Sequence, residues 1–235
     1  MDITTLNHIQ NLIQASEHAV DIIAVTKTRP FSCVKDAYDA GVLHIGENRV
    51  EEAAVKIQTA SELGIHGLVW HMIGHVQSRK VKRVVELFDC IDSVDSVSVA
   101  TAISLHAGKI HKHISMLLEV NISGESTKQG FALYNWGHDR AVFGAFLEDI
   151  KYMLELPNIS IDGFMIMPPY VTDATENAPY FRSVRALAAR IRTEIPSVGA
   201  VLSMGTSCDY TSAIVEGSTQ IRLGETLFGQ RTSTP

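Results

Sequence analysis

Short apolar runs alternate with amphipathic stretches along the whole chain of 235 residues. Eight of these runs are rich in Val, Ile, Leu and Met, and their length is typical of β-strands. In the first run, Ile22 to Val25 are apolar on consecutive positions, which indicates a strand covered on both faces. The eight predicted strands occupy residues 21–27, 42–48, 67–74, 90–96, 114–121, 161–167, 199–205 and 219–225.

Helical patterns fill several of the segments between these strands. The first such segment opens at Ser32, which we expect to be an N-cap, and closes at Gly41, a C-cap glycine. A later segment repeats apolar residues at steps of three and four positions, with arginines on the opposite face. The last segment is short, and Asp209 is placed to cap it. The predicted helices cover residues 1–20, 32–41, 49–64, 180–195 and 208–217.

Strands that alternate with helices or turns predict an α/β protein with a parallel sheet. Eight such units favour a single (β/α)8 barrel, the TIM-barrel architecture. A doubly wound open sheet uses the same alternation and is the alternative, although open sheets usually contain fewer strands. No linker rich in Pro, Gly or Ser divides the chain, so we expect one domain over residues 1–235. The longest irregular stretch, residues 121–140, follows the fifth strand, where a barrel places functional loops.

Composition and charge narrow the range of functions. Hydrophobic residues make up 46% and charged residues 20% of the chain, which is typical of a globular protein with a sizeable core. The net charge of −6, with both signs interspersed, argues against a nucleic-acid-binding protein, which needs a basic face. No apolar run reaches the roughly 20 residues that span a bilayer, and the N-terminus has no secretory signal pattern. The cysteines Cys33, Cys90 and Cys208 lack metal-ligand spacing and predict reduced thiols, so we expect a cytoplasmic protein without a metal.

Polar side chains stand at the predicted carboxyl ends of the strands, where barrels and open sheets both bind ligands. The first strand ends in Lys27, the second in Glu47 and Asn48, and the third runs into His71 and His75. A polar residue is common wherever one strand leaves the core. Polar residues at all eight predicted strand ends, several of them accompanied by glycines, indicate a ligand-binding site.

The lysine and the glycines together predict a particular chemistry. A desolvated lysine has a lowered pKa and becomes a nucleophile toward carbonyl groups, and Lys27 stands at an apolar strand end. Glycines and hydroxyls after the last two strands are typical of a phosphate site in barrels. The ligand is then an aldehyde phosphate, either pyridoxal phosphate or the substrate of a sugar-phosphate aldolase. The predicted phosphate site consists of Ser203, Gly205, Thr206, Ser207 and Gly224.

Arg222 lies in the middle of the eighth predicted strand, between two apolar residues. One interpretation is that it donates a hydrogen bond to a pyridine nitrogen, which keeps that nitrogen unprotonated and weakens the electron sink of the cofactor. The other is a salt bridge inside the barrel with Glu47 or Glu225. The spacing alone leaves both open.

The remaining histidine and carboxylate clusters favour ordinary surface roles. His106, His111 and His113 match no metal-ligand spacing and are interpreted as surface histidines. Glu51 and Glu52 lie on a predicted helix and are interpreted as part of its solvent-exposed face.

Several motifs in one order give the chain a wider resemblance. They are "AVTKTRP", "HIGENRVEEAAVK", "WHMIGHVQSRKVK", "LLEVNISGESTKQGF", "LSMGTSCDYTSAI" and "GSTQIRLGETLFGQR". From about residue 20 to residue 231, the chain resembles the YggS/PROSC family of pyridoxal-phosphate homeostasis proteins. That family is similar to the N-terminal barrel of alanine racemase and to the fold-type III decarboxylases.

The resemblance implies roles for the residues that match the family motifs. Lys27 matches the lysine that holds pyridoxal phosphate as an internal aldimine, and Arg222 matches the arginine that faces the pyridine nitrogen. Lys128 matches a lysine in the loop over the site. The further cofactor-binding residues that the resemblance implies are Asn48, His75, Ser203, Met204, Gly205, Thr206, Gly224 and Glu225.

Two positions near the expected phosphate depart from the family pattern. Thr206 stands where the family has a second methionine, and its hydroxyl would add a donor to the phosphate. Glu225 stands where many members have Thr or Ser. Because a carboxylate repels a phosphate, we expect the backbone N–H of Glu225 to contact the phosphate while its side chain turns away.

The resemblance implies a cofactor-binding protein rather than an efficient enzyme. Fold-type III racemases bring a catalytic tyrosine from a second domain after the barrel, whereas this chain ends at Pro235, just after the eighth predicted strand. We therefore expect a monomer that holds pyridoxal phosphate, delivers it to PLP-dependent apo-enzymes and keeps cofactor and amino-acid pools balanced. The alternative is a weakly active PLP-dependent racemase or lyase on an amino acid.

Overall fold

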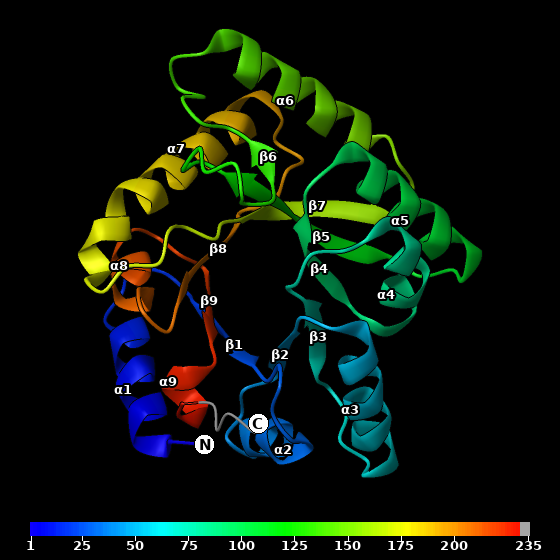
Figure 1. Ribbon diagram of the computed structural model, residues 1–235, viewed down its shortest axis with the longest axis vertical. Helices are drawn as coiled ribbons and strands as arrows, with labels where there is room; N and C mark the ends of the chain where they lie inside the picture. The colour runs from blue at the N-terminus through cyan, green and yellow to red at the C-terminus, as the bar shows by residue number, and fades with distance from the viewer. Residues whose placement is uncertain (231–235) are drawn as a thin grey trace.

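Eight parallel strands close into a barrel in the computed structural model, which describes residues 1–230 (Figure 1). The strands are β1 (Asp21–Val25), β2 (His44–Glu47), β3 (Val69–Met72), β4 (Cys90–Val94), β5 (Ile114–Asn121), β6 (Phe131–Ala132), β7 (Ile159–Met165), β8 (Val201–Thr206) and β9 (Gln220–Leu223). Their order in the sheet is β4-β3-β2-β1-β9-β8-β7-β5-β6, and an additional pairing of β4 with β5 closes the ring. The predicted (β/α)8 barrel is thereby confirmed, and the open-sheet alternative is wrong.

The eight predicted strands are all present, and one short strand was not predicted. This strand, β6, pairs only with the end of β5 and lies in the stretch that we predicted to be irregular. Two residues are too few to show a period in the sequence. Residues 231–235, the end of the predicted domain 1–235 and of the family resemblance, lie outside the described residues.

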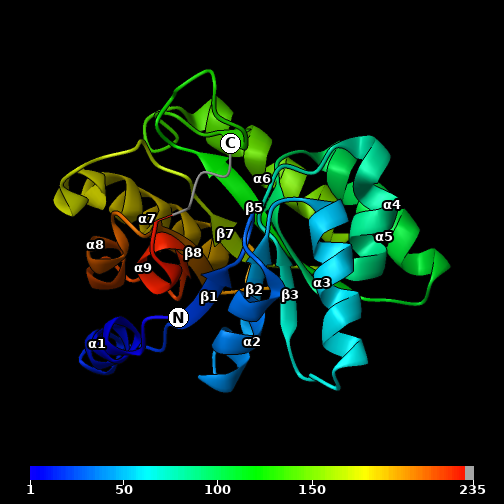
Figure 2. The same ribbon diagram turned by 60° about the horizontal axis from the view of Figure 1, so that its bottom comes forward.

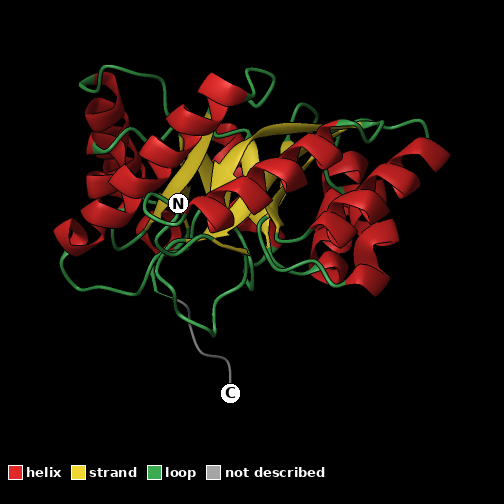
Figure 3. Ribbon diagram, turned by 90° about the horizontal axis from the view of Figure 1, so that it is seen from above, coloured by secondary structure: helices red, strands yellow, loops and turns green. Residues whose placement is uncertain are grey.

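Helices surround the strands (Figure 3). The α-helices are α1 (Ile3–Gln14), α2 (Phe31–Asp39), α3 (Val50–Glu62), α4 (Val81–Leu87), α5 (Val97–Lys109), α6 (Arg140–Leu154), α7 (Ala178–Glu194), α8 (Tyr210–Val215) and α9 (Glu225–Phe228), with 3-10 turns η1 (Ser78–Lys80) and η2 (Ala174–Asn177). The start of α1 meets α9, the last described helix, where the N–H of Asp2 donates to the carbonyl of Leu227 at 2.8 Å (Figure 2). No helix within residues 1–230 is both long and apolar enough to cross a membrane.

Alternate side chains along each strand face two environments. Ala24 and Ile45 belong to the core between strands and helices. Ile23 points into the barrel instead, where its Cγ2 lies 2.9 Å from the position that a Cβ on Gly46 would occupy. The glycine on β2 therefore makes room for the large side chain on β1.

Helix α3 carries a charge on its buried face. Its buried residues are spaced by three or four positions and form one stripe toward the barrel. They are Val50, Ala53, Lys56 and Ala60. A lysine therefore lies within an otherwise apolar stripe, directly behind β1 and β2.

Two of the predicted helix caps differ in the structure. Pro30 is the N-cap of α2, and Ser32 lies inside the first turn, because the ring of Pro30 already fixes the extended backbone before the helix. Gly41, with φ of 79°, follows the end of α2 in the left-handed region as predicted. Asp209 does occupy the N-cap position of α8, but its carboxylate accepts from the N–H of Thr206 at 2.7 Å rather than from the helix.

Candidate functional site

Lys27 lies in the loop that leaves β1, and it is half-buried. Strand β1 pairs with β2 on one side and with β9 on the other. Asn48 directly follows β2, and Gly224 directly follows β9, so both leave strands that adjoin the strand of Lys27. The end of the barrel formed by these carboxyl ends of the strands is called the barrel mouth below (Figure 1).

The guanidinium of Arg222 is buried at the barrel mouth and is held by neutral acceptors. Its Nη1 donates to the carbonyl oxygen and to Oγ of Ser203, both at 2.7 Å. Its Nη2 donates to the carbonyl of Ile166 at 2.8 Å and lies 3.0 Å from Sδ of Met167. The carbonyl and the hydroxyl of Ser203 therefore both help to hold the arginine in place.

The interpretation of Arg222 as a salt-bridge partner of Glu47 or Glu225 is wrong for the described residues. Glu47 points out of the barrel toward α3, where its Oε1 lies 2.6 Å from Nζ of Lys56. Glu225 is exposed at the start of α9. The charge of Arg222 instead faces more distant carboxylates, Asp92 and Glu119 among them.

A turn after β8 presents unpaired backbone donors at the barrel mouth. Oγ of Ser207 accepts from the N–H groups of Gly224 and Thr226, at 3.3 and 3.2 Å, and so ties the loop after β8 to the loop after β9. The backbone N–H groups of Ser207 and Cys208 form no hydrogen bond to any residue in the range 1–230. Adjacent unpaired N–H groups on a turn favour an anion.

Thr206 and Glu225, the two departures from the family pattern, differ in what they offer. The N–H and the hydroxyl of Thr206 both donate to Oδ1 of Asp209, at 2.7 and 3.0 Å. Asp209 is in turn held by Nδ2 of Asn177 at 2.7 Å. The hydroxyl of Thr206 is therefore engaged within the protein, whereas the side chain of Glu225 reaches solvent.

The two glycines of the predicted phosphate site differ in whether the packing of the protein requires them. Gly205 has φ of 94°, and a Cβ there would lie 2.6 Å from Cβ of Ala213, so it is needed for α8 to pack on β8. A Cβ on Gly224 would meet Val25, with its carbonyl oxygen at 3.4 Å and its Cβ and Cγ1 at 3.6 and 3.8 Å, which are ordinary contacts. Packing within the described protein therefore does not require a glycine at Gly224.

Asn48 and His75 come together through a third glycine. A Cβ on Gly74 would lie 2.6 Å from the carbonyl oxygen of Asn48, so the glycine allows the loop after β3 to contact the loop after β2. Oδ1 of Asn48 is buried and has no hydrogen-bond partner in residues 1–230. His75 is partly exposed, with Nδ1 2.9 Å from Oδ2 of Asp95. The amide oxygen of Asn48 can therefore receive a donor from a ligand.

Comparison with known proteins agrees with this geometry. The family model for the N-terminal domain of alanine racemase matches residues 4–232. The pyridoxal phosphate homeostasis protein of Aquifex aeolicus is 35% identical over 215 residues, which cover 92% of this chain and 89% of that protein. The Escherichia coli K12 protein of the same name is 33% identical over 217 residues, which cover 92% of this chain and 88% of that protein. The chain belongs to the pyridoxal phosphate homeostasis protein family.

Solved structures place this family member among barrels of the same kind. PipY of Synechococcus elongatus, solved with PLP bound, is 32% identical, with a TM-score of 0.81 over 96% of this chain and 100% of that chain. Alanine racemase of Clostridium difficile in complex with cycloserine is 17% identical, with a TM-score of 0.74 over 98% of this chain and 59% of that chain. The racemase shares the fold, and its identity to this chain is too low to say more.

Of three other residues considered from the sequence, two lie away from the barrel mouth and one reaches it. The side chain of Met204 is fully buried in the core between strands and helices, so it does not line the barrel mouth. His71 lies deeper in the barrel, between Asp92 at 3.1 Å and His44 at 2.9 Å. Lys128 does reach the mouth: its Nζ donates to the carbonyl of Met167 at 2.8 Å, which ties the loop after β5 to the end of β7.

Two sets of charged residues were not predicted from the sequence. Glu119 on β5 is buried, and this burial raises the pKa of its carboxyl although Arg222 acts in the opposite direction. A carboxylate on the barrel-facing side of a predicted buried strand was the available signal. The second set is Lys56 with Glu52: Glu52, assigned to a solvent-exposed face, is only 23% exposed and lies 2.7 Å from Nζ of Lys56. The assignment is correct for Glu51, which is 70% exposed.

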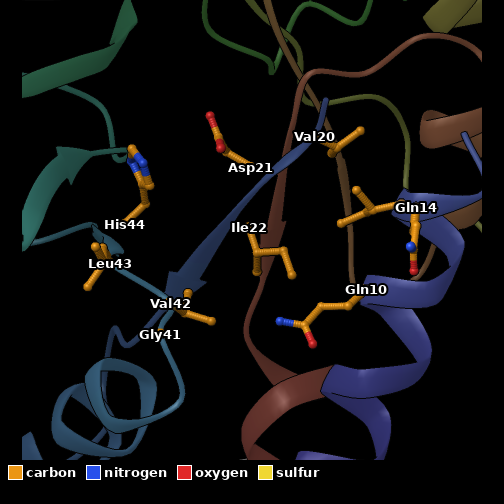
Figure 4. A pocket seen from close by; sticks show the side chains of 10 residues that line it. Gln10, Gln14, Val20, Asp21, Ile22, Gly41, Val42, Leu43 and His44 are labelled. Atoms are coloured by element: carbon orange, nitrogen blue, oxygen red, sulfur yellow. The ribbon is translucent and has the colours of Figure 1, made fainter. Parts of the chain in front are cut away.

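A separate pocket of about 410 Å³ lies at the opposite end of the barrel, between α1 and the starts of β1 and β2 (Figure 4). Its polar lining residues are Gln10, Gln14, Asp21 and His44. Since ligands of barrel proteins bind at the carboxyl ends of the strands, this pocket at the amino ends is not the predicted site.

Proposed function

We propose that this protein binds pyridoxal 5′-phosphate at the barrel mouth, with Lys27 as the point of covalent attachment, and that it holds the cofactor to keep the free pool in balance. One observation carries the proposal. A half-buried lysine meets a buried arginine and two unpaired backbone N–H groups at one barrel mouth, in a chain 32% identical to PipY, which was solved with PLP bound.

The described residues fit the cofactor at its phosphate end and beside its ring. The N–H groups of Ser207 and Cys208 would hold the phosphate, and the absence of a side chain at Gly224 would let that loop approach it closely. The N–H of Glu225 would add a donor, with its carboxylate left in solvent. Oδ1 of Asn48, buried without a partner in residues 1–230, would accept from a hydroxyl of the ligand.

Lys27 and Arg222 would have different roles at the cofactor: Lys27 would form the covalent bond, and Arg222 would face the ring nitrogen. When bound, the cofactor supplies an aldehyde that condenses with a lysine amine, and one water molecule leaves as the C=N bond forms. Lys27 contributes that amine. Arg222 would hold a positive charge against the ring nitrogen and so disfavour its protonation, while Ser203 keeps the guanidinium in place. A ring nitrogen without a proton withdraws fewer electrons, which suits holding the cofactor rather than turnover.

Delivery is the second part of the proposal. The protein acts as a cytoplasmic monomer and passes the cofactor to PLP-dependent apo-enzymes. The loop after β7 supports this role, because it exposes two large apolar side chains beside the mouth, Met167 and Tyr170, where an acceptor protein would approach.

The test is a titration of the purified protein with pyridoxal 5′-phosphate, followed by borohydride reduction and peptide mass analysis. We expect the wild type to gain a visible absorbance band and a reduced cofactor on the Lys27 peptide, and Lys27→Ala to gain neither. Lys35→Ala is the matched control, because Lys35 is an exposed lysine on α2 that pairs with Asp39. A band of wild-type strength in Lys27→Ala, or no band in the wild type, contradicts the proposal.

His75 favours a second candidate function, a weak racemase or lyase on amino acids. Its ring lies 2.9 Å from the carboxylate of Asp95 and is partly exposed, an arrangement in which a histidine can accept and donate a proton. Turnover of an amino acid that is lost in Lys27→Ala and falls at least about tenfold in His75→Asn would support this candidate. Turnover no higher than in Lys27→Ala would remove it.

A further inference from the structure

A buried lysine lies directly behind the loop of Lys27. Lys56, on α3, is 4% exposed. Its Nζ donates to the carbonyl of Thr26 at 2.7 Å, to Oε1 of Glu47 at 2.6 Å and to Oε1 of Glu52 at 2.7 Å. A lysine ammonium has three N–H donors, so all three are used.

The partners of Lys56 hold the backbone on both sides of Lys27. Before Lys27, Thr26 gives its carbonyl to Lys56 and donates its hydroxyl to Oε1 of Glu47 at 2.5 Å. After Lys27, the N–H of Thr28 donates to Oε1 of Glu52 at 2.7 Å. One buried ammonium therefore connects the residue before Lys27 to the residue after it.

The residue after Lys27 needs such support. Thr28 has φ of 60°, in the left-handed region that β-branched residues rarely adopt. The peptide that joins Lys27 to Thr28 is held in this conformation by the carboxylate of Glu52. The direction in which the side chain of Lys27 leaves the backbone follows from the conformation of the same two residues.

We infer that Lys56, Glu47 and Glu52 form a positioning device that aims the amine of Lys27 at the aldehyde carbon of its ligand. The inference rests on the proposed function, since aiming matters only if Lys27 forms a bond to the cofactor. All three would act on Lys27 through its neighbours in the chain. Glu47 and Lys56 are buried between the barrel and α3 and hold Thr26, and Glu52 holds the backbone of Thr28.

Glu52→Ala tests the inference with the smallest risk to the fold, because Glu52 is the partly exposed member of the network. Glu51→Ala is the matched control: it removes the same charge from the adjacent position of α3, where the carboxylate pairs with Lys80 on the surface. Glu52→Gln is the conservative variant, because its amide oxygen can still accept from Thr28.

Two ligands distinguish an effect on the rate of bond formation at Lys27 from an effect on the affinity of the site. Pyridoxal 5′-phosphate reports the rate at which the bond to Lys27 forms, followed by visible absorbance and borohydride trapping. Pyridoxine 5′-phosphate has an alcohol in place of the aldehyde, so its affinity, measured by calorimetry, reports the phosphate and ring contacts alone. We expect Glu52→Ala to form the bond about tenfold more slowly than the wild type, with an unchanged affinity for pyridoxine 5′-phosphate. Glu51→Ala and Glu52→Gln should match the wild type within about twofold.

The outcomes distinguish this inference from the proposed function. If the wild type forms no bond to Lys27, the proposed function fails. If the wild type forms the bond and Glu52→Ala is as fast as Glu51→Ala, the positioning inference is overturned and the proposed function stands. An equal loss of bond formation and of pyridoxine 5′-phosphate affinity in Glu52→Ala also overturns the inference, because the variant then disturbs the whole site.

Discussion

Replacement of Lys56 by methionine should be among the most destabilising single changes in this chain. The substitution removes the ammonium and leaves its three acceptors. Glu52 is partly exposed and can be hydrated, and the carbonyl of Thr26 still accepts from the N–H of Arg29 at 3.0 Å. Glu47 cannot be hydrated, because its side chain is 0% exposed. Without Lys56 it keeps only the neutral hydroxyl of Thr26 on Oε1, and its Oε2 has no partner in residues 1–230. The cost therefore comes mainly from one uncompensated buried carboxylate, about 3–5 kcal/mol.

The pH dependence identifies the cause of that loss. Burial already raises the pKa of Glu47 above its usual value of 4.5, with Lys56 acting in the opposite direction, so removal of Lys56 raises it further. A carboxyl whose pKa is higher in the folded state binds more protons there, so the folded state gains stability as the pH falls. We expect the deficit of Lys56→Met to be largest at pH 8 and to shrink toward pH 5.

Urea denaturation of wild type and variant at pH 8 and pH 5.5, with equal m-values, measures the deficit. At this chain length we expect a fall in melting temperature of roughly 6 to 20 °C at pH 8. The double variant Lys56→Met/Glu47→Gln should recover at least about half of the loss, because the buried charge is gone. A loss below about 1 kcal/mol at pH 8, or an equal loss at both pH values and in the double variant, would refute the reasoning.

Three further predictions concern other parts of the chain. Gly205→Ala should destabilise the protein by about 1–3 kcal/mol in urea denaturation, because the new Cβ would lie 2.6 Å from Cβ of Ala213. Gly224→Ala should unfold like the wild type, but it should bind pyridoxal 5′-phosphate at least about tenfold more weakly. Asn48→Ala should likewise leave the unfolding midpoint nearly unchanged and weaken the cofactor by about fivefold to tenfold in the same titration, because its Oδ1 has no protein partner in residues 1–230. Burial, with a smaller contribution from His71, lowers the pKa of His44 below its usual value of 6.5, so the wild type should lose stability as the pH falls below 6.5. His44→Gln should lose less stability between pH 7 and pH 5, measured by urea denaturation at both pH values.

The barrel and the location of its candidate site could be predicted from the sequence because both depend on runs of apolar residues and on the polar residues at the ends of those runs. Eight apolar runs of strand length define the barrel, and parallel strands end on the same side. Lys27 and Asn48 were found in this way, from their places at strand ends, and Arg222 was found from its place between apolar residues within a strand. Their places along the strands depend on the sequence pattern, whereas their roles depend on contacts that the pattern does not contain.

The contacts of individual side chains could not be predicted, because they depend on which face of an element a residue occupies. A shift of one position along β8 separates Ser203, which holds Arg222, from Met204, which packs in the core. On α3, Glu51 and Glu52 are adjacent in sequence, but only Glu52 turns toward the loop of Lys27. The partner of Glu47 was likewise beyond the sequence pattern, since Lys56 reaches it from nine positions along the chain, across the gap between helix and strand.

Two cations, Lys56 and Arg222, are buried within residues 1–230. Their charges are balanced in different ways, and the difference agrees with the roles proposed for them. Lys56 is bound directly by two carboxylates, so its charge is cancelled where it lies and its contribution is geometric. Arg222 is bound by carbonyl oxygens, a hydroxyl and a thioether, which are neutral, and the carboxylates that face it act only from a distance. Its charge therefore remains available to a ligand at the barrel mouth. A protein that only needed a stable core would gain by pairing Arg222 directly with a carboxylate, because a buried and unpaired cation is costly. That Arg222 is held by neutral groups, at the end of the barrel where Lys27 stands, is the arrangement expected of an arginine whose charge is kept for the cofactor.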